Sequence, residues 1–116
     1  MKAPTPSGAT HNYPRRPFDP EHAIADRITD RGFERMDVLV DLLFKESDDQ
    51  LRKWGIQEHT VFEWLAFLTE EVGELAQSIA DTHFRDGDWM DARDEAIQVA
   101  TLALKIAEGL LTGAPR

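Results

Sequence analysis

The chain is 116 residues long, contains no cysteine and carries a formal net charge of −9 at pH 7. Its 41% hydrophobic and 30% charged residues are typical of one globular domain with a modest core. The lack of cysteine excludes disulfides and thiolate metal sites, and the acidic balance argues against a nucleic-acid-binding surface, which needs a basic patch. The N-terminus lacks the apolar run of a signal peptide, and no stretch approaches the roughly 18 apolar residues that cross a membrane. We therefore expect a cytoplasmic protein with no nucleic-acid partner and no membrane partner.

Five of the six prolines fall within the first 20 residues. Proline fixes its own φ and disfavours the helical conformation of the residue before it. Residues 1–19 are therefore predicted to form a proline-rich arm, which is either a flexible leader or a segment that embraces a partner subunit. Residues 20–112 are predicted to form one helical domain, and residues 113–116 a short C-terminal tail.

Two helices are predicted in the first half of this domain. A short helix over residues 21–31 begins with Pro20 in its first turn and stops at Gly32. A second helix over residues 34–54 follows from the helical spacing of its apolar side chains, and Gly55 ends it.

A third helix is predicted over residues 60–82. Thr60 and Glu63 have the spacing of a capping box, in which each side chain binds the backbone N–H of the other residue. Apolar residues then recur at steps of three and four, as in closely packed antiparallel helices. They are Val61, Leu65, Leu68, Val72, Leu75 and Ile79. A second face carries small residues, with Gly73 in mid-helix, and would let another helix approach closely.

Residues 83–87 are predicted to form a turn, because Asp86-Gly87 is a strong helix breaker. Asp88 caps a last helix that runs to about Leu111 and is apolar over more than half of its circumference. A helix this apolar in so short a chain predicts cover from a second subunit. The predicted fold class is all-α, a bundle of about four helices whose core a second subunit completes.

Three of four clustered glutamates lie beside or within apolar faces. Glu71 and Glu74 flank the apolar face of the third helix, with Glu70 further round, and Glu95 falls inside the apolar arc of the last helix. The tight turn between these helices would bring the acidic edges together, with Gln98 beside them. Either this is an acidic face neutralised by lysine, arginine or water, or its oxygen ligands hold a hard cation such as Mg²⁺.

The residues around these acids resemble a known family signature. Glu70-Glu71-Val72-Gly73-Glu74, followed by Glu95-Ala96-Ile97-Gln98, is similar to the E-E-x-x-E … E-x-x-D pattern of the MazG-like, all-α nucleoside triphosphate pyrophosphohydrolases. The run from Gln50 to Gly55 and the Glu63-Trp64-Leu65 segment also resemble the small bacterial and phage-type members. The resemblance covers about residues 48–111.

The resemblance implies a Mg²⁺-dependent enzyme, with Mn²⁺ as an alternative ion, that hydrolyses a nucleoside triphosphate between its α and β phosphates. Glu71, Glu74 and Glu95 would be metal ligands. The family's fourth ligand is usually aspartate, and Gln98 holds that position here. Asp91, one turn before Glu95, is a candidate substitute for the missing charge. The resemblance also implies a homodimer or a tetramer formed by two dimers, and a house-cleaning role toward non-standard nucleotides.

The remaining site residues are assigned by the chemistry of such a reaction. Glu70 or Glu74 would accept the proton of the attacking water. The cations that could contact the phosphates are Lys53, Arg85 and Lys105. Trp54 would either stack on the base or anchor the end of its helix in the core. The alternative function is a non-catalytic helical module for binding or assembly that has lost activity through Gln98.

Overall fold

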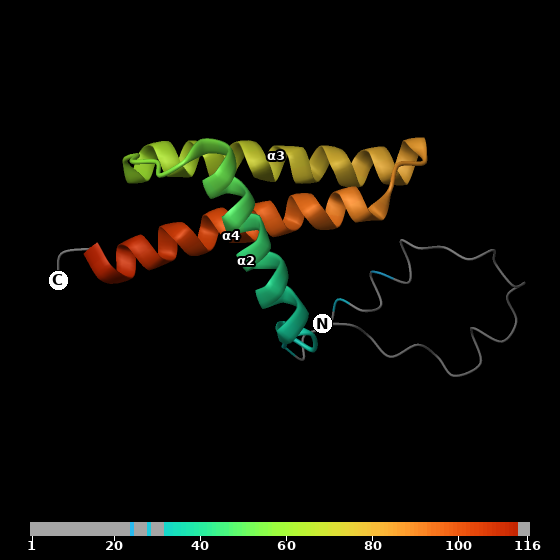
Figure 1. The fold of residues 1–116 in the computed structure, drawn as a ribbon. Coiled ribbons are helices and arrows are strands. Elements are labelled where there is room, and N and C mark those ends of the chain that lie inside the picture. The colour runs from blue at the N-terminus through green and yellow to red at the C-terminus, as the bar shows by residue number, and fades with distance from the viewer. Residues whose placement is uncertain (1–23, 25–27, 29–31, 114–116) are drawn as a thin grey trace, which may run out of the picture. The chain divides into compact units, whose positions relative to one another are not determined.

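The computed structural model describes Ile24, Ile28 and residues 32–113. The chain divides into two units, Met1–Gly32 and Phe33–Arg116, and the second contains three α-helices (Figure 1). These are α2 (Met36–Trp54), α3 (Val61–Arg85) and α4 (Trp89–Gly113). The described residues include no strand, so the predicted all-α class is confirmed.

The described helices number three, and not the four that were predicted. The predicted helix over residues 21–31 falls outside the described residues except for Ile24 and Ile28, whose backbones share a 3.2 Å hydrogen bond. The predicted arm over residues 1–19 and residues 114–116 of the predicted tail also lie outside them, whereas Gly113, the first residue of that tail, ends the last helix.

Helix α2 ends where the sequence predicts. Gly55 has a φ of 68°, a left-handed conformation that glycine adopts without strain, and its N–H bonds to the carbonyl of Leu51 at 2.8 Å. Arg52 and Lys53 lie in the last turn, where positive charge complements the helix dipole. The helix begins at Met36, two residues after the predicted start, and its N-cap residue Arg35 makes no side-chain capping bond.

The predicted capping box opens α3. The Glu63 N–H donates to Thr60 Oγ1 at 3.1 Å, and the Thr60 N–H donates to Glu63 Oε1 at 2.8 Å. Two of the four N–H groups that a helix leaves without partners are thereby bonded.

Helix α3 continues three residues beyond its predicted end, so the prediction of a turn over residues 83–85 is wrong. Asp81 links one turn back to Gln77 and one turn forward to Arg85, which supports the last turn. The helix stops only at Asp86, which has a φ of 58° and donates its N–H to the Asp81 carbonyl.

Helices α3 and α4 form an antiparallel hairpin, and α2 crosses and packs against α4 (Figure 1). The connection is short, and the Asp88 side chain accepts the N–H of Met90 at 2.9 Å at the start of α4. All four buried residues in the described part of the chain lie on α4. They are Ala92, Ile97, Thr101 and Leu102. The core is therefore the face of α4 that meets the other two helices.

The apolar face of α3 is only half covered within one chain. Leu68 and Leu75 are half-buried, whereas Val72 and Ile79 are 47% and 42% exposed. A Cβ added to Gly73 would meet no atom within 4 Å, so no described residue packs closely on the small-residue face at this position. That the core is completed by a second subunit stays a prediction.

Helix α4 has the length and composition of a membrane span, which corrects the expectation that no stretch is apolar enough. Only Lys105 and Glu108 are charged between residues 96 and 113, and the remaining positions are apolar, small, hydroxyl or amide. The core helix of a soluble protein meets the same criterion, and α4 supplies the buried residues of this unit. The absence of a membrane partner stays a prediction.

Replacing Thr60 with alanine should destabilise the fold, because it removes one partner of the capping box. The expected loss in free energy of unfolding is about 1 kcal/mol, measured by urea denaturation. Thr69→Ala is the matched control, since Thr69 is exposed in mid-helix and its hydroxyl bonds only the Leu65 carbonyl. Equal stabilities for the two variants would contradict the assigned role of the cap.

Candidate metal centre and adjoining pocket

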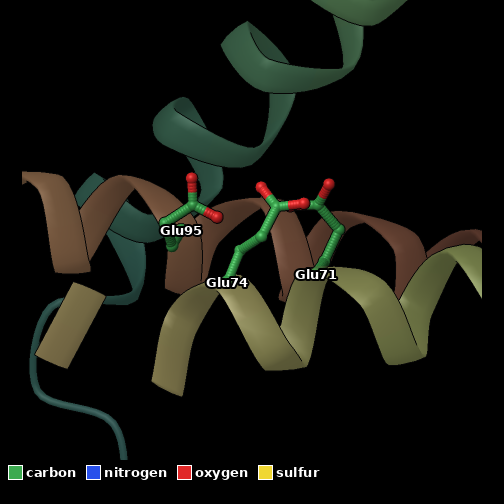
Figure 2. A group of neighbouring side chains, drawn as sticks. All are labelled: Glu71, Glu74 and Glu95. Atoms are coloured by element: carbon green, nitrogen blue, oxygen red, sulfur yellow. The ribbon is translucent and has the colours of Figure 1, made fainter. Parts of the chain in front are cut away.

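Helices α3 and α4 bring three carboxylates to one point. Glu71 and Glu74 lie one turn apart on α3, and Glu95 faces them from α4 (Figure 2). One carboxylate oxygen from each residue lies within 4.8 Å of the others. Three acids predicted as metal ligands from the sequence are thus neighbours in the structure.

No lysine or arginine in the described part of the chain forms an ion pair with these three acids. The described ion pairs of arginine lie elsewhere, as in Arg85 with Asp81 and Arg93 with Asp94. With the carboxyls ionised, the Oε2 atoms of Glu71 and Glu95 are buried and have no hydrogen-bond partner. A buried carboxylate oxygen without a partner is costly, so the cluster lacks a neutralising group within the described residues.

The surroundings favour protonation of the acids when no cation is bound. Burial, followed by repulsion from Glu74, Glu95 and Glu46, raises the pKa of Glu71 from 4.5 to about 7. Burial and the charge of Glu74 also raise the pKa of Glu95. A proton on Glu71 can be donated to Glu95, which favours the protonated form of Glu71 and the ionised form of Glu95.

A fourth carboxylate, Glu46 of α2, was not among the site residues predicted from the sequence. Its charge repels both Glu71 and Glu95, so it lies close to the acidic cluster. Glu46 is half-buried and accepts a 2.8 Å hydrogen bond from Gln50 Nε2. The two acidic motifs belong to α3 and α4, so they give no signal for a residue of α2. The position of Glu46 one helical turn before Gln50 is the one sequence feature that could have indicated it as a site residue.

A pocket of about 230 Å³ adjoins the cluster and shares Glu71 with it. Residues of all three helices and of the loop before α3 form its wall. They are Gln50, Trp54, Gln57, Trp64, Phe67, Glu70, Glu71, Gln98 and Leu102. Gln98, the departure from the family pattern, and Glu70, a predicted proton acceptor, therefore both face this pocket.

Aromatic rings hold one another in one wall of the pocket. His59 lies edge-to-face against both Trp64 and Phe67, with ring centroids 4.9 Å apart in each case. Trp64 and Phe67 are themselves edge-to-face at 5.8 Å. Such pairs are favourable beyond their buried area, so the rings form a preorganised apolar surface. The spacing of the histidines matches no metal-ligand pattern, so no sequence signal indicated this packing role of His59.

None of the predicted phosphate-binding cations forms an ion pair with Glu71, Glu74 or Glu95 among the described residues. The Nζ atom of Lys53 is 5.0 Å from the centre of the Trp54 ring, where it covers one face of that ring. Arg85 pairs with Asp81, and Lys105 donates a 2.6 Å hydrogen bond to Gln50. None of these cations lines the pocket that contains Glu71. Their predicted contacts with phosphate stay predictions.

Asp91, which the sequence suggested as a substitute for the charge missing at Gln98, lies on the other side of the cluster. It lines a second cavity together with Glu74, Asp81 and Glu95. Gln98 and Asp91 thus face different cavities.

No protein-family model matches the chain, and no curated protein and no solved structure is detectably similar to it. The functional inference therefore depends on the residues and their geometry.

The stability of the metal-free protein should fall as pH rises from about 5 to 7.5. The unfolded chain releases the Glu71 proton near pH 4.5, whereas the folded chain holds it until about pH 7, so rising pH favours unfolding across this window. Thermal melts in EDTA should show the fall, and Glu71→Gln should flatten it.

Glu70→Gln is the matched control, because Glu70 is the exposed neighbour outside the carboxylate cluster. The control should keep the slope of the parent protein. A parent melting temperature that rises across the same window would contradict the raised pKa of Glu71.

Proposed function

We propose that the chain is a Mg²⁺-dependent nucleotide pyrophosphohydrolase, which cleaves a (d)NTP to a (d)NMP and pyrophosphate. The observation that carries this proposal is that a carboxylate cluster and an aromatic pocket share Glu71. The carboxylate cluster suits a cation that binds the phosphates of the substrate, and the aromatic pocket suits the flat ring of its base. The resemblance of the two acidic motifs to the MazG-like enzymes supports the same function.

The acidic cluster fits a hard divalent cation. Its donors are carboxylate oxygens, the ligands that Mg²⁺ and Mn²⁺ prefer, and two of these oxygens are buried without a partner. Glu71, Glu74 and Glu95 would hold the ion. A bound Mg²⁺ supplies neutralisation of the phosphate charge and orientation of water. A cation is needed here in particular, because the chain has a net charge of −9 and its substrate is an anion.

The proposed roles of the other residues follow from their positions. Glu70 lines the pocket and would accept the proton of the attacking water, with Glu74 as the alternative acceptor. The aromatic surface of Trp64 and Phe67 would receive the base, and Trp54 would stack on it when Lys53 moves off the ring. Gln98 faces the same pocket and would offer a neutral amide where the family pattern has a charged carboxylate.

The second candidate function is a non-catalytic helical module, and Gln98 is the observation that favours it. An amide contributes no charge, so a cation site with Gln98 in place of aspartate would bind Mg²⁺ more weakly. Glu46 offsets this loss, because it brings a carboxylate from α2 toward Glu71 and Glu95.

We also propose a homodimer, or a tetramer formed by two such dimers, located in the cytoplasm. Only four residues of the described chain are buried, while large apolar side chains along α3 stay about half exposed. A second copy that covers this face would complete the core.

Pyrophosphate release should be measurable with Mg²⁺ and a panel of NTPs and dNTPs. Glu71→Gln and Glu95→Gln should each abolish turnover and preserve or raise the melting temperature, because each relieves repulsion among the clustered carboxylates. Asp94→Asn is the control, since Asp94 is exposed and pairs with Arg93. No turnover with any nucleotide, together with no Mg²⁺ binding by calorimetry, would favour the non-catalytic module.

Light scattering should give a mass of about twice or four times that of the 13.2 kDa chain. Val72→Glu should shift the protein toward monomer, because it places a charge on the exposed apolar face of α3. Leu111→Glu is the control, at a 79% exposed position near the end of α4. A parent protein that stays monomeric at high concentration would contradict the proposed assembly.

A further inference from the structure

A chain of three polar side chains connects α4 to α2. Lys105 Nζ donates to Gln50 Oε1 at 2.6 Å, and Gln50 Nε2 donates to Glu46 Oε2 at 2.8 Å. All three side chains are half-buried. Both bonds involve a charged group, so they are stronger than bonds between neutral groups.

The two charges fix which way the Gln50 amide faces. A carboxylate only accepts hydrogen bonds and an ammonium only donates them. Rotating the amide by 180° would place its oxygen against Glu46 and its NH₂ group against Lys105, which loses both bonds. Gln57 and Gln98, the other two amides of the pocket, have no such charged partners on both sides among the described hydrogen bonds. Gln50 is therefore the amide of fixed orientation in the pocket wall.

The fixed amide leaves one hydrogen-bond donor for a ligand. Its nitrogen carries two hydrogens, and Glu46 takes one of them. Gln50 shares the pocket with Trp54 and Trp64, whose rings suit a flat base, and Glu71 sits where the pocket meets the acidic cluster. A base in this pocket would thus meet the Gln50 amide with one of its edges.

We propose that Gln50 is the specificity-determining residue of this pocket, and that it donates its second N–H to a carbonyl oxygen of the bound base. Lys105 and Glu46 are positioning residues, which act by holding the amide. The pocket then prefers a base with a carbonyl group over the matched base with an amino group: uracil over cytosine, and hypoxanthine over adenine. That the pocket binds a base rests on the proposed function. Binding of nucleosides to the pocket can be measured without any hydrolysis.

This proposal gives Lys105 a role other than the predicted contact with phosphate. Lys105 does not line the pocket that contains Glu71, and its ammonium already bonds to Gln50. The ammonium of Lys105 affects the substrate indirectly, because its bond to Gln50 holds the orientation of the Gln50 amide.

The test measures binding of four nucleosides by ligand-detected NMR and calorimetry, with no phosphate and no Mg²⁺. The pairs are uridine with cytidine, and inosine with adenosine, and each pair differs by a carbonyl against an amino group. The parent protein should bind the carbonyl member about five- to tenfold more tightly, which corresponds to about one hydrogen bond. Lys105→Met should reduce this preference, because only the bond to Glu46 then holds the orientation of the amide.

Gln50→Glu should reverse the preference toward cytidine and adenosine, because a carboxylate accepts from an amino group and cannot donate to a carbonyl. If the role of Gln50 were purely structural, Gln50→Glu would weaken the binding of all four nucleosides equally. Lys45→Met is the matched control: Lys45 is an exposed lysine on α2 that pairs with Asp49, and its loss should leave the preference unchanged.

Equal binding within each pair, tighter binding of the amino members, or no binding of any nucleoside would overturn the proposal. Full retention of the preference in Lys105→Met would overturn the positioning role. These outcomes are separate from failure of the proposed function, which shows as an absence of pyrophosphate release. Circular dichroism should confirm that each variant is folded before its binding is interpreted.

Discussion

Carboxylates at the junction of three helices repel one another, and both the protonation of these acids and the proposed binding of a cation follow from this repulsion. Glu71, Glu74 and Glu95 approach within 4.8 Å without a cationic partner in the described residues, and Glu46 adds a fourth charge. Such a cluster can be stabilised by taking up protons, by a cation, or by a positive group from another subunit. The raised pKa of Glu71 is the proton response, and a bound metal would compete with those protons for the same oxygens.

The same helices that gather the acids also build a pocket beside them. The hairpin of α3 and α4 places Glu71 on the common edge, and α2 closes the pocket with Gln50 and Trp54. The acidic cluster and the adjoining pocket match the two halves of a nucleotide, since phosphates need charge neutralisation and a base needs a flat apolar surface. The Lys105–Gln50–Glu46 chain is related to both regions, because Gln50 lines the pocket and the charge of Glu46 repels Glu71 and Glu95.

Local features of the fold were predictable from the sequence. The capping box at Thr60 and the glycine end at Gly55 follow from residue chemistry alone, and the spacing of the acids correctly indicated which carboxylates meet. Features that need a third helix were not predictable. Glu46 approaches the cluster only because α2 crosses α4, and Lys105 reaches Gln50 across 55 residues of sequence. The predicted end of α3 lies three residues too early, because the bonds of Asp81 to Gln77 and Arg85 support the last turn up to the Asp86-Gly87 breaker.

The most direct test of the central claim is a crystal structure of the full chain soaked with Mn²⁺, with an anomalous difference map. Manganese is suitable because it takes the same oxygen ligands as Mg²⁺ and scatters anomalously. We expect a peak enclosed by the carboxylates of Glu71, Glu74 and Glu95. An empty cluster whose carboxylates are instead paired with lysine or arginine of a second subunit would contradict it.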